Sequence, residues 1–149
     1  MDCEKDFSFD RLLAVIGRLQ ATRADQAMDK IGLFRGQAFL LMILSHHDGL
    51  THTEIAQKMQ ISPAAVTKII QRMEKLNYVQ RCPDPNDERI SRVFLMDEGK
   101  AVTQQIHHSF TEIDEVIIAG FSEEDQKKLK TLLLRVLKNL KNRSCVQDQ

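Results

Sequence analysis

The sequence predicts a mainly α-helical protein with one small β-hairpin, and three observations support this fold class. Apolar residues recur at helical spacing over most of the chain, whereas short strand-like runs occur only within residues 79–96. Glycines and prolines mark the boundaries between these segments. The chain has 149 residues, 42% of them hydrophobic, which is enough for one domain with its own core.

Two helices are predicted in the first third of the chain. One face of the first carries Phe9, Leu12, Leu13, Ile16 and Leu19. This spacing predicts an amphipathic helix over roughly 8–28, which Gly32 ends. The segment GQAFLLMILSHH follows and is apolar on nearly all sides, so we expect it to form the central buried helix.

Two shorter helices follow, each with a clear start signal. Thr51 and Glu54 have the spacing of a capping box, and Ile55, Ala56 and Met59 should face inward from that helix. The next helix runs from Pro63 to about Asn77. Ser62 is a natural N-cap for it, and proline fits the first helical position, where a missing N–H costs nothing.

The second half of the chain begins with two predicted strands, Val79 to Pro83 and Ser91 to Met96, joined by a charged loop. A helix is expected from Asp97 to about Gly120, and Ser122 with Asp125 should start a final helix. The stripe on that last helix consists of Leu129, Leu132, Leu133, Val136, Leu137 and Leu140. Two short helices joined by a tight turn and followed by a hairpin describe a winged helix-turn-helix.

The helix from Pro63 to Asn77 has two contrasting faces. The predicted core face carries Val66, Ile69, Ile70, Met73 and Leu76, and the opposite face carries Ala64, Thr67, Lys68, Gln71, Arg72 and Lys75. Small residues allow close approach to a DNA groove, Thr and Gln can hydrogen-bond base edges, and Lys and Arg can reach phosphate or guanine. An ordinary solvated helix face is the alternative, and the neighbouring helix, turn and hairpin argue against it.

At these residues the sequence resembles the MarR family of transcriptional regulators. The resemblance runs from about Leu33 to Val102 and rests on GQAFLLMIL, LTHTEIAQKMQISPAAVTKIIQRMEKLNYVQR and DPNDERISRVFLMDEGKAV. The wing signature of the family matches Asp87, Arg89, Arg92 and Val93. Asn77 stands where the family commonly has Gly, and it tolerates the same left-handed conformation.

The resemblance implies a homodimeric regulator that binds specific, roughly palindromic double-stranded DNA, most simply a repressor of nearby genes. The expected organisation is an N-terminal dimerisation helix in 1–32, a winged DNA-binding lobe in 33–96 and C-terminal dimerisation helices in 97–149. The implied recognition surface is Ser62, Ala64, Ala65, Thr67, Lys68, Gln71 and Arg72. Arg89 would enter the minor groove, and Asp87 would brace the wing by pairing with an arginine such as Arg92, which could instead contact the backbone.

The apolar stripes at the two chain ends give an independent argument for a dimer. So small a winged domain would not bury both, whereas a second subunit would, and its two-fold symmetry would match a palindromic site. Packing of both stripes within one subunit is the alternative.

The sequence gives less information on which signal, if any, the protein responds to. In the family a small organic effector commonly binds a cleft beside the dimer helices, and the candidate lining is Phe34, Phe39, Met42 and His46. His108 and Glu112 have metal-ligand spacing, but we expect no metal site and no cofactor. A disulfide between subunits through Cys3 or Cys145 is a further alternative, and Cys82 has no assigned role.

Composition excludes several other classes. A balance of 21 basic and 21 acidic residues argues against a strongly basic coat protein, and no apolar run reaches the roughly 18 residues of a membrane span. The first ten residues do not resemble a secretory signal, so we expect a cytoplasmic protein. We find no catalytic motif and expect no enzyme. A winged-helix protein-interaction module remains the alternative to a DNA-binding regulator.

Overall fold

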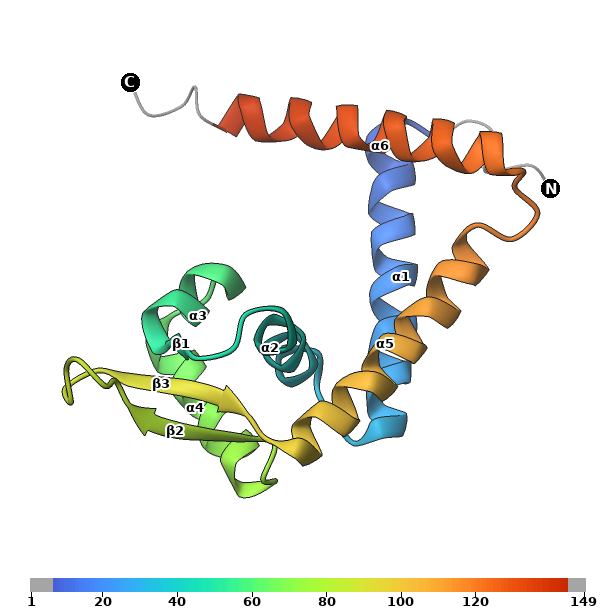
Figure 1. The fold of residues 1–149 in the computed structure, drawn as a ribbon. Coiled ribbons are helices and arrows are strands. Elements are labelled where there is room, and N and C mark those ends of the chain that lie inside the picture. The colour runs from blue at the N-terminus through green and yellow to red at the C-terminus, as the bar shows by residue number, and fades with distance from the viewer. Residues whose placement is uncertain (1–6, 145–149) are drawn as a thin grey trace. The chain divides into compact units, whose positions relative to one another are not determined.

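The computed structural model describes residues 7–144 and contains six helices and three short strands in that range (Figure 1). The chain forms two compact units, of which the first ends at Ile113 and the second begins at Asp114. The predicted mainly helical fold with a small β-wing is confirmed. In chain order the elements are α1 (Phe9–Ile31), α2 (Arg35–His46), β1 (Leu50–Thr51), α3 (His52–Met59), α4 (Pro63–Lys75), β2 (Val79–Pro83), β3 (Ser91–Leu95), α5 (Asp97–Ile117) and α6 (Glu123–Ser144).

The predicted helix boundaries are confirmed where a capping residue carries the signal. Gly32 ends α1 with φ of 77°, and its N–H bonds to two carbonyls of the last helical turn. Thr51 and Glu54 form the reciprocal bonds of a capping box on α3, at 3.2 and 2.7 Å. The Ser62 hydroxyl accepts the Ala65 N–H at 3.2 Å at the start of α4.

The sheet has one strand more than the sequence predicts. Its order is β1-β3-β2, and β1 pairs Leu50 with Val93 and Thr51 with Arg92. A two-residue strand leaves no periodic pattern in the sequence, because it forms only where β3 offers it a free edge. The antiparallel β2–β3 hairpin and its connecting loop, residues 84–90, form the wing.

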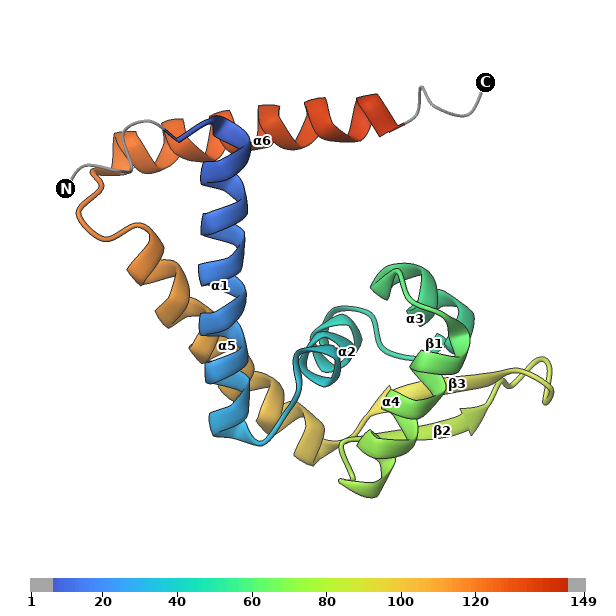
Figure 2. The same ribbon diagram turned by 180° about the vertical axis from the view of Figure 1, so that it is seen from behind.

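The core of the first unit lies where α2 meets α3, α4 and the sheet, and α4 lies beside both α3 and the hairpin (Figure 2). Residues with no exposed surface in this core are Leu40, Leu41, Ile55, Val66, Ile70, Met73, Val93 and, from α5, Ile106. Two expectations need correction. Phe39 is 48% exposed, because α2 also forms a cavity wall, and Leu76 is 44% exposed, because it follows the last turn of α4.

The start of α5 packs tightly on the segment between α4 and β2. Asn77 adopts a left-handed φ of 57°, as predicted, and the chain turns there into β2. A Cβ added to the buried Gly99 of α5 would lie 2.1 Å from the Tyr78 carbonyl oxygen. Only glycine therefore permits this approach of helix to backbone.

Within the second unit, α6 begins where the sequence predicts, with the Asp125 N–H bonded to the Ser122 hydroxyl at 3.1 Å. Its large apolar side chains are extensively exposed, among them Leu133 at 47% and Leu134 at 56%. Among the described residues, no helix combines the length and the apolar character that crossing a lipid bilayer requires.

Candidate nucleic-acid interface

The outer face of α4 is polar and cationic, and the side chains at its centre are exposed. Ala64, Lys68, Gln71 and Lys75 are exposed, whereas Val66, Ile70 and Met73 on the opposite face are buried. In the described part of the chain, neither Lys68 nor Lys75 forms an ion pair. A helix of this kind can offer amide and ammonium donors to base edges and phosphates.

The other predicted residues of this surface lie at its margins. Ser62 is exposed at the N-terminus of α4, where the positive end of the helix dipole favours an anion. Ala65 and Thr67 are half-buried, and the Thr67 hydroxyl donates to the Pro63 carbonyl at 3.0 Å. The Arg72 guanidinium carbon lies 5.2 Å from the centre of the Phe34 ring.

A bidentate ion pair joins α4 to the wing. The guanidinium of Arg81 in β2 donates to both carboxylate oxygens of Glu74, at 2.8 and 2.7 Å. The hydrogen bonds to Glu74 raise the pKa of Arg81 above its usual value. Sequence reasoning missed this pair, because the two residues are separated by a turn and no helical or strand period links them.

A second charged network holds the base of the wing. The carboxylate of Asp84, which is only 6% exposed, accepts the Asn86 N–H at 2.8 Å and a hydrogen bond from the Arg92 Nε. These bonds, the one from Asn86 first, hold the pKa of Asp84 below its usual value. The Arg92 Nη1 also donates to the Gly49 carbonyl at 2.8 Å, which ties the wing to the segment before β1.

The prediction that Asp87 braces the wing by pairing with an arginine is therefore wrong, because Arg92 pairs with Asp84 instead. Within the described residues, Asp87 makes no ion pair, and its carboxylate accepts only the Arg89 backbone N–H, at 3.0 Å. The strand register explains the difference. Arg92 lies opposite Cys82, so its diagonal neighbour on the same face is Asp84, directly after β2, whereas Asp87 lies further along the loop.

Arg89 lies in the exposed loop of the wing. Its side chain is exposed, and no acidic residue in the described range forms an ion pair with it. The guanidinium is thus available to a ligand. Near the other end of the hairpin, the Asp48 carboxylate accepts the N–H groups of Gly49 and Leu95 at 3.0 and 2.9 Å, which fixes β3 to the α2–β1 turn.

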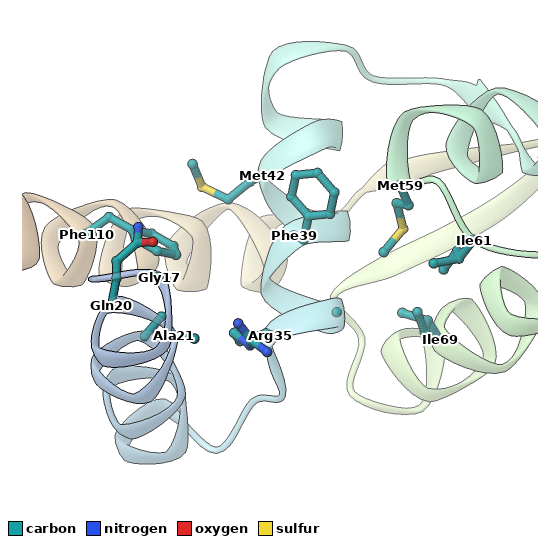
Figure 3. Close-up of a pocket in the computed structure, with 12 residues that line it drawn as sticks. Gly17, Gln20, Ala21, Arg35, Phe39, Met42, Met59, Ile61, Ile69 and Phe110 are labelled. Carbon is teal, nitrogen blue, oxygen red and sulfur yellow. The ribbon is translucent and has the colours of Figure 1, made fainter. Parts of the chain in front are cut away.

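A cavity of about 760 Å³ lies next to α4 in the first unit. Figure 3 shows side chains from α1, α2, α4 and α5 around it, including Phe39, Met42, Ile69 and Phe110. Its wall is mostly apolar, and the cation at its edge, Arg35, pairs with Asp25 at 2.7 Å. Of the predicted pocket residues, Phe39 and Met42 line this cavity.

The remaining predicted pocket and metal residues lie elsewhere. His46 lines a smaller cavity of about 370 Å³ with Phe39 and Met42, and Phe34 lines neither cavity. His108 lies 3.6 Å from Glu112, and the described residues contain no group of three possible metal ligands. Cys82 is a half-buried free thiol in β2, while Cys3 and Cys145 lie outside the described residues.

Comparisons with known proteins agree on one family for the winged lobe. The model of the MarR family matches residues 33–91. The uncharacterized HTH-type transcriptional regulator YybA of Bacillus subtilis is 24% identical over 130 residues, which cover 87% of each chain. The HTH-type transcriptional repressor MdtR of the same organism is 33% identical over 81 residues, which cover 54% of this chain and 52% of MdtR.

Solved structures extend the similarity to most of the fold. A variant of MepR from Staphylococcus aureus has a TM-score of 0.80 and 25% identity, with 90% of this chain and 99% of that chain covered. A MepR variant bound to an oligodeoxyribonucleotide has a TM-score of 0.65 and 25% identity, with 91% and 99% covered.

Proposed function

We propose that this chain is a winged helix-turn-helix transcriptional regulator of the MarR family, that it binds specific double-stranded DNA sites as a homodimer and that it represses nearby genes. The observation that carries this proposal is the exposed polar face of α4 beside a braced wing, whose Arg89 forms no ion pair with any described residue. The relative MdtR is named a transcriptional repressor, and a MepR variant was solved with an oligodeoxyribonucleotide, which supports the same role.

Each part of the proposed interface has a distinct role. α4 enters the major groove, where Ala64 permits close approach and Gln71 hydrogen-bonds a base edge. Lys68 and the N-terminus of α4 bind phosphate. Arg89 enters the adjacent minor groove, whose negative potential favours a guanidinium. Arg92 acts through Asp84 and Gly49 by holding the wing in place, rather than through DNA.

Selection of bound duplexes from a random-sequence library tests the function directly. We expect enrichment of a two-fold symmetric site and binding that weakens steeply with salt, because phosphate contacts release counterions. Arg89→Ala should weaken binding, whereas Lys100→Ala, which also removes one positive charge but lies on α5, should change it little. Failure to bind any duplex at low salt would contradict the proposal and favour a protein-interaction module.

Base reading by Gln71 can be separated from phosphate binding. Gln71→Ala should relax the preference at one position of each half-site, at a cost of roughly 1–3 kcal/mol for the preferred base. Lys68→Ala should instead weaken binding to all sequences by a similar factor. Repeating the selection with each variant distinguishes the two outcomes.

The exposed apolar faces of α1 and α6 support the homodimer. Phe9 is 88% exposed and Ile16 53% in α1, and Leu137 is 47% exposed in α6. Contiguous exposed apolar faces of this extent mark interaction sites, and a two-fold dimer would match a palindromic duplex. Sedimentation of the intact chain should give the mass of a dimer at micromolar concentration.

The 760 Å³ cavity is the proposed site of a small apolar effector that releases DNA. Its size and apolar wall fit a drug-sized ligand, and it touches α4 directly through Ile69. The fluorescent probe anilinonaphthalene sulfonate should bind there. Ala21→Phe, which fills the cavity from α1, should abolish this binding and leave DNA binding intact. Equal probe fluorescence in both proteins would argue against the site.

A further inference from the structure

Phe34 is an aromatic residue that neither the fold nor the cavities explain. It is the N-cap residue of α2, a position that favours Ser, Thr, Asp or Asn. The buried Gln37 satisfies the backbone of this turn, since its side-chain oxygen accepts the Phe34 N–H at 2.9 Å. The ring of Phe34 is 61% exposed and lines neither cavity described above. Helix capping, core packing and the lining of the two cavities described above therefore leave this ring without a role.

The contact that the ring does make is with the recognition helix. The Arg72 guanidinium carbon lies 5.2 Å from the ring centre, within the range of a cation–π interaction. The two helices approach closely here. A Cβ added to Gly36 of α2 would lie 3.5 Å from the Ile69 Cδ1, and Ile69 is one turn before Arg72 on the same flank of α4.

The Arg72 guanidinium over the Phe34 ring remains able to bind an anion. In the described part of the chain Arg72 forms no ion pair, so no carboxylate occupies its N–H groups. A guanidinium over a ring face makes this contact without using its N–H groups as donors to another side chain, and it has less rotamer freedom to lose when it binds phosphate. Among the described basic residues of α4, which also include Lys68 and Lys75, Arg72 is the one with a ring contact.

We propose that Phe34 is a positioning residue for DNA binding, which holds the Arg72 guanidinium at the α2-facing edge of the recognition helix as a phosphate contact beside the groove. This inference rests on the proposed DNA-binding function. Arg72 would then contact a DNA phosphate rather than a base. Phe34, the N-cap residue of α2, would contribute to DNA binding through this arginine.

A double-mutant cycle on a duplex selected by the unaltered protein tests the inference. Affinity is measured as a function of salt for the unaltered protein, Phe34→Leu, Phe34→Tyr, Arg72→Gln and the combination of Phe34→Leu with Arg72→Gln. Arg72→Gln should lower the salt dependence by about one phosphate contact. Phe34→Leu should weaken binding by about two- to fivefold without changing that dependence, and Phe34→Tyr, which keeps the ring, should bind as the unaltered protein does.

The decisive comparison is the effect of Phe34→Leu in the absence of Arg72. If Phe34 acts through Arg72, the combined variant binds no more weakly than Arg72→Gln alone. An equal loss in both backgrounds, no loss at all, or a tyrosine variant as weak as the leucine variant overturns the inference and leaves the proposed function intact. A lack of duplex binding by the unaltered protein would overturn both.

Discussion

The winged lobe and the terminal helices differ in how far their apolar side chains are exposed. In the lobe, the side chains of Leu41, Val66 and Ile70 are fully buried. Charged side chains of the same lobe are paired, as in the bonds from Arg92 to Asp84 and from Arg81 to Glu74. In α1 and α6, apolar side chains such as Ile16 and Leu134 are more than half exposed. Both regions are rich in aliphatic residues, so composition alone does not distinguish them.

The lobe buries its apolar side chains, whereas α1 and α6 leave their apolar stripes exposed and would bury them only against a partner. The apolar side chains of the lobe are buried within the first unit, whose core also includes Met28 of α1 and Ile106 of α5, and the polar outer face of α4 is left for a ligand. The terminal helices have a regular apolar stripe and few contacts to cover it, which is typical of helices that associate with a second subunit.

The largest expected effect comes from charging the stripe of α6. Leu133→Glu combined with Leu137→Glu should yield a monomer, because two carboxylates would be buried in the proposed interface. Loss of two-site binding should weaken the affinity for a palindromic duplex by about 10²-fold or more. Sedimentation and duplex titration measure both effects. Thr131→Glu, on the opposite and polar face of the same helix, is the control and should remain dimeric.

The second effect concerns the stability of the lobe. Ile70→Ala removes a side chain with 0% exposure and should lower the free energy of unfolding by about 2–5 kcal/mol, since it leaves a cavity. Leu76→Ala at the end of the same helix, where the side chain is 44% exposed, should cost much less. Urea unfolding of the two variants gives the comparison, and equal costs would contradict the described core.

The third effect distinguishes the two aspartates of the wing. Asp84→Asn should lower the melting temperature and weaken DNA binding, because it removes the negative charge and one of the two oxygens that accept bonds from Asn86 and Arg92, whereas Asp87→Asn should change both little. The folded chain lowers the pKa of Asp84, so its contribution is present above the usual value of 3.8 and is lost as pH falls through the lowered pKa. The melting difference from Asp84→Asn should therefore shrink in strong acid.

The smallest effect concerns His52 at the start of α3. Partial burial first, and then the nearby Arg81, lower the pKa of this imidazole from 6.5. The folded chain favours the neutral form, so the stabilisation is fully present above pH 6.5 and is lost as pH falls through the lowered pKa. His52→Gln should make unfolding less sensitive to pH below neutrality. His108→Gln, where the side chain is 76% exposed, serves as the control in the same titration.

The sequence predicts the helices and their ends well, because these signals are local. Ser62, the Thr51–Glu54 box and Gly32 each act on a neighbouring turn, and the structure confirms them. The sites that it misses depend on register and tertiary approach. Asp84 braces Arg92 because of which residues face each other across the hairpin, and Glu74 meets Arg81 across a turn. β1 needs a free edge of β3, which no local pattern encodes.

The predicted recognition surface remains a prediction at the level of individual residues, yet the structure separates its members by environment. Lys68 and Gln71 are exposed on the outer face, Thr67 is hydrogen-bonded within the helix, and Arg72 lies against Phe34. A helical wheel places these residues on one broad face. It does not reveal which neighbouring element adjoins each flank, because that depends on how α2 packs.

The outer face of α4 has a consequence for how such a protein changes over generations. The side chains of Ala64, Lys68, Gln71 and Lys75 are exposed, while the bonds that hold the lobe together lie on its other sides. Exposed positions of this kind tolerate replacement with little loss of stability. A duplicated copy of this chain could therefore acquire a new operator by a few substitutions on one helix, without compensating changes in the rest of the lobe.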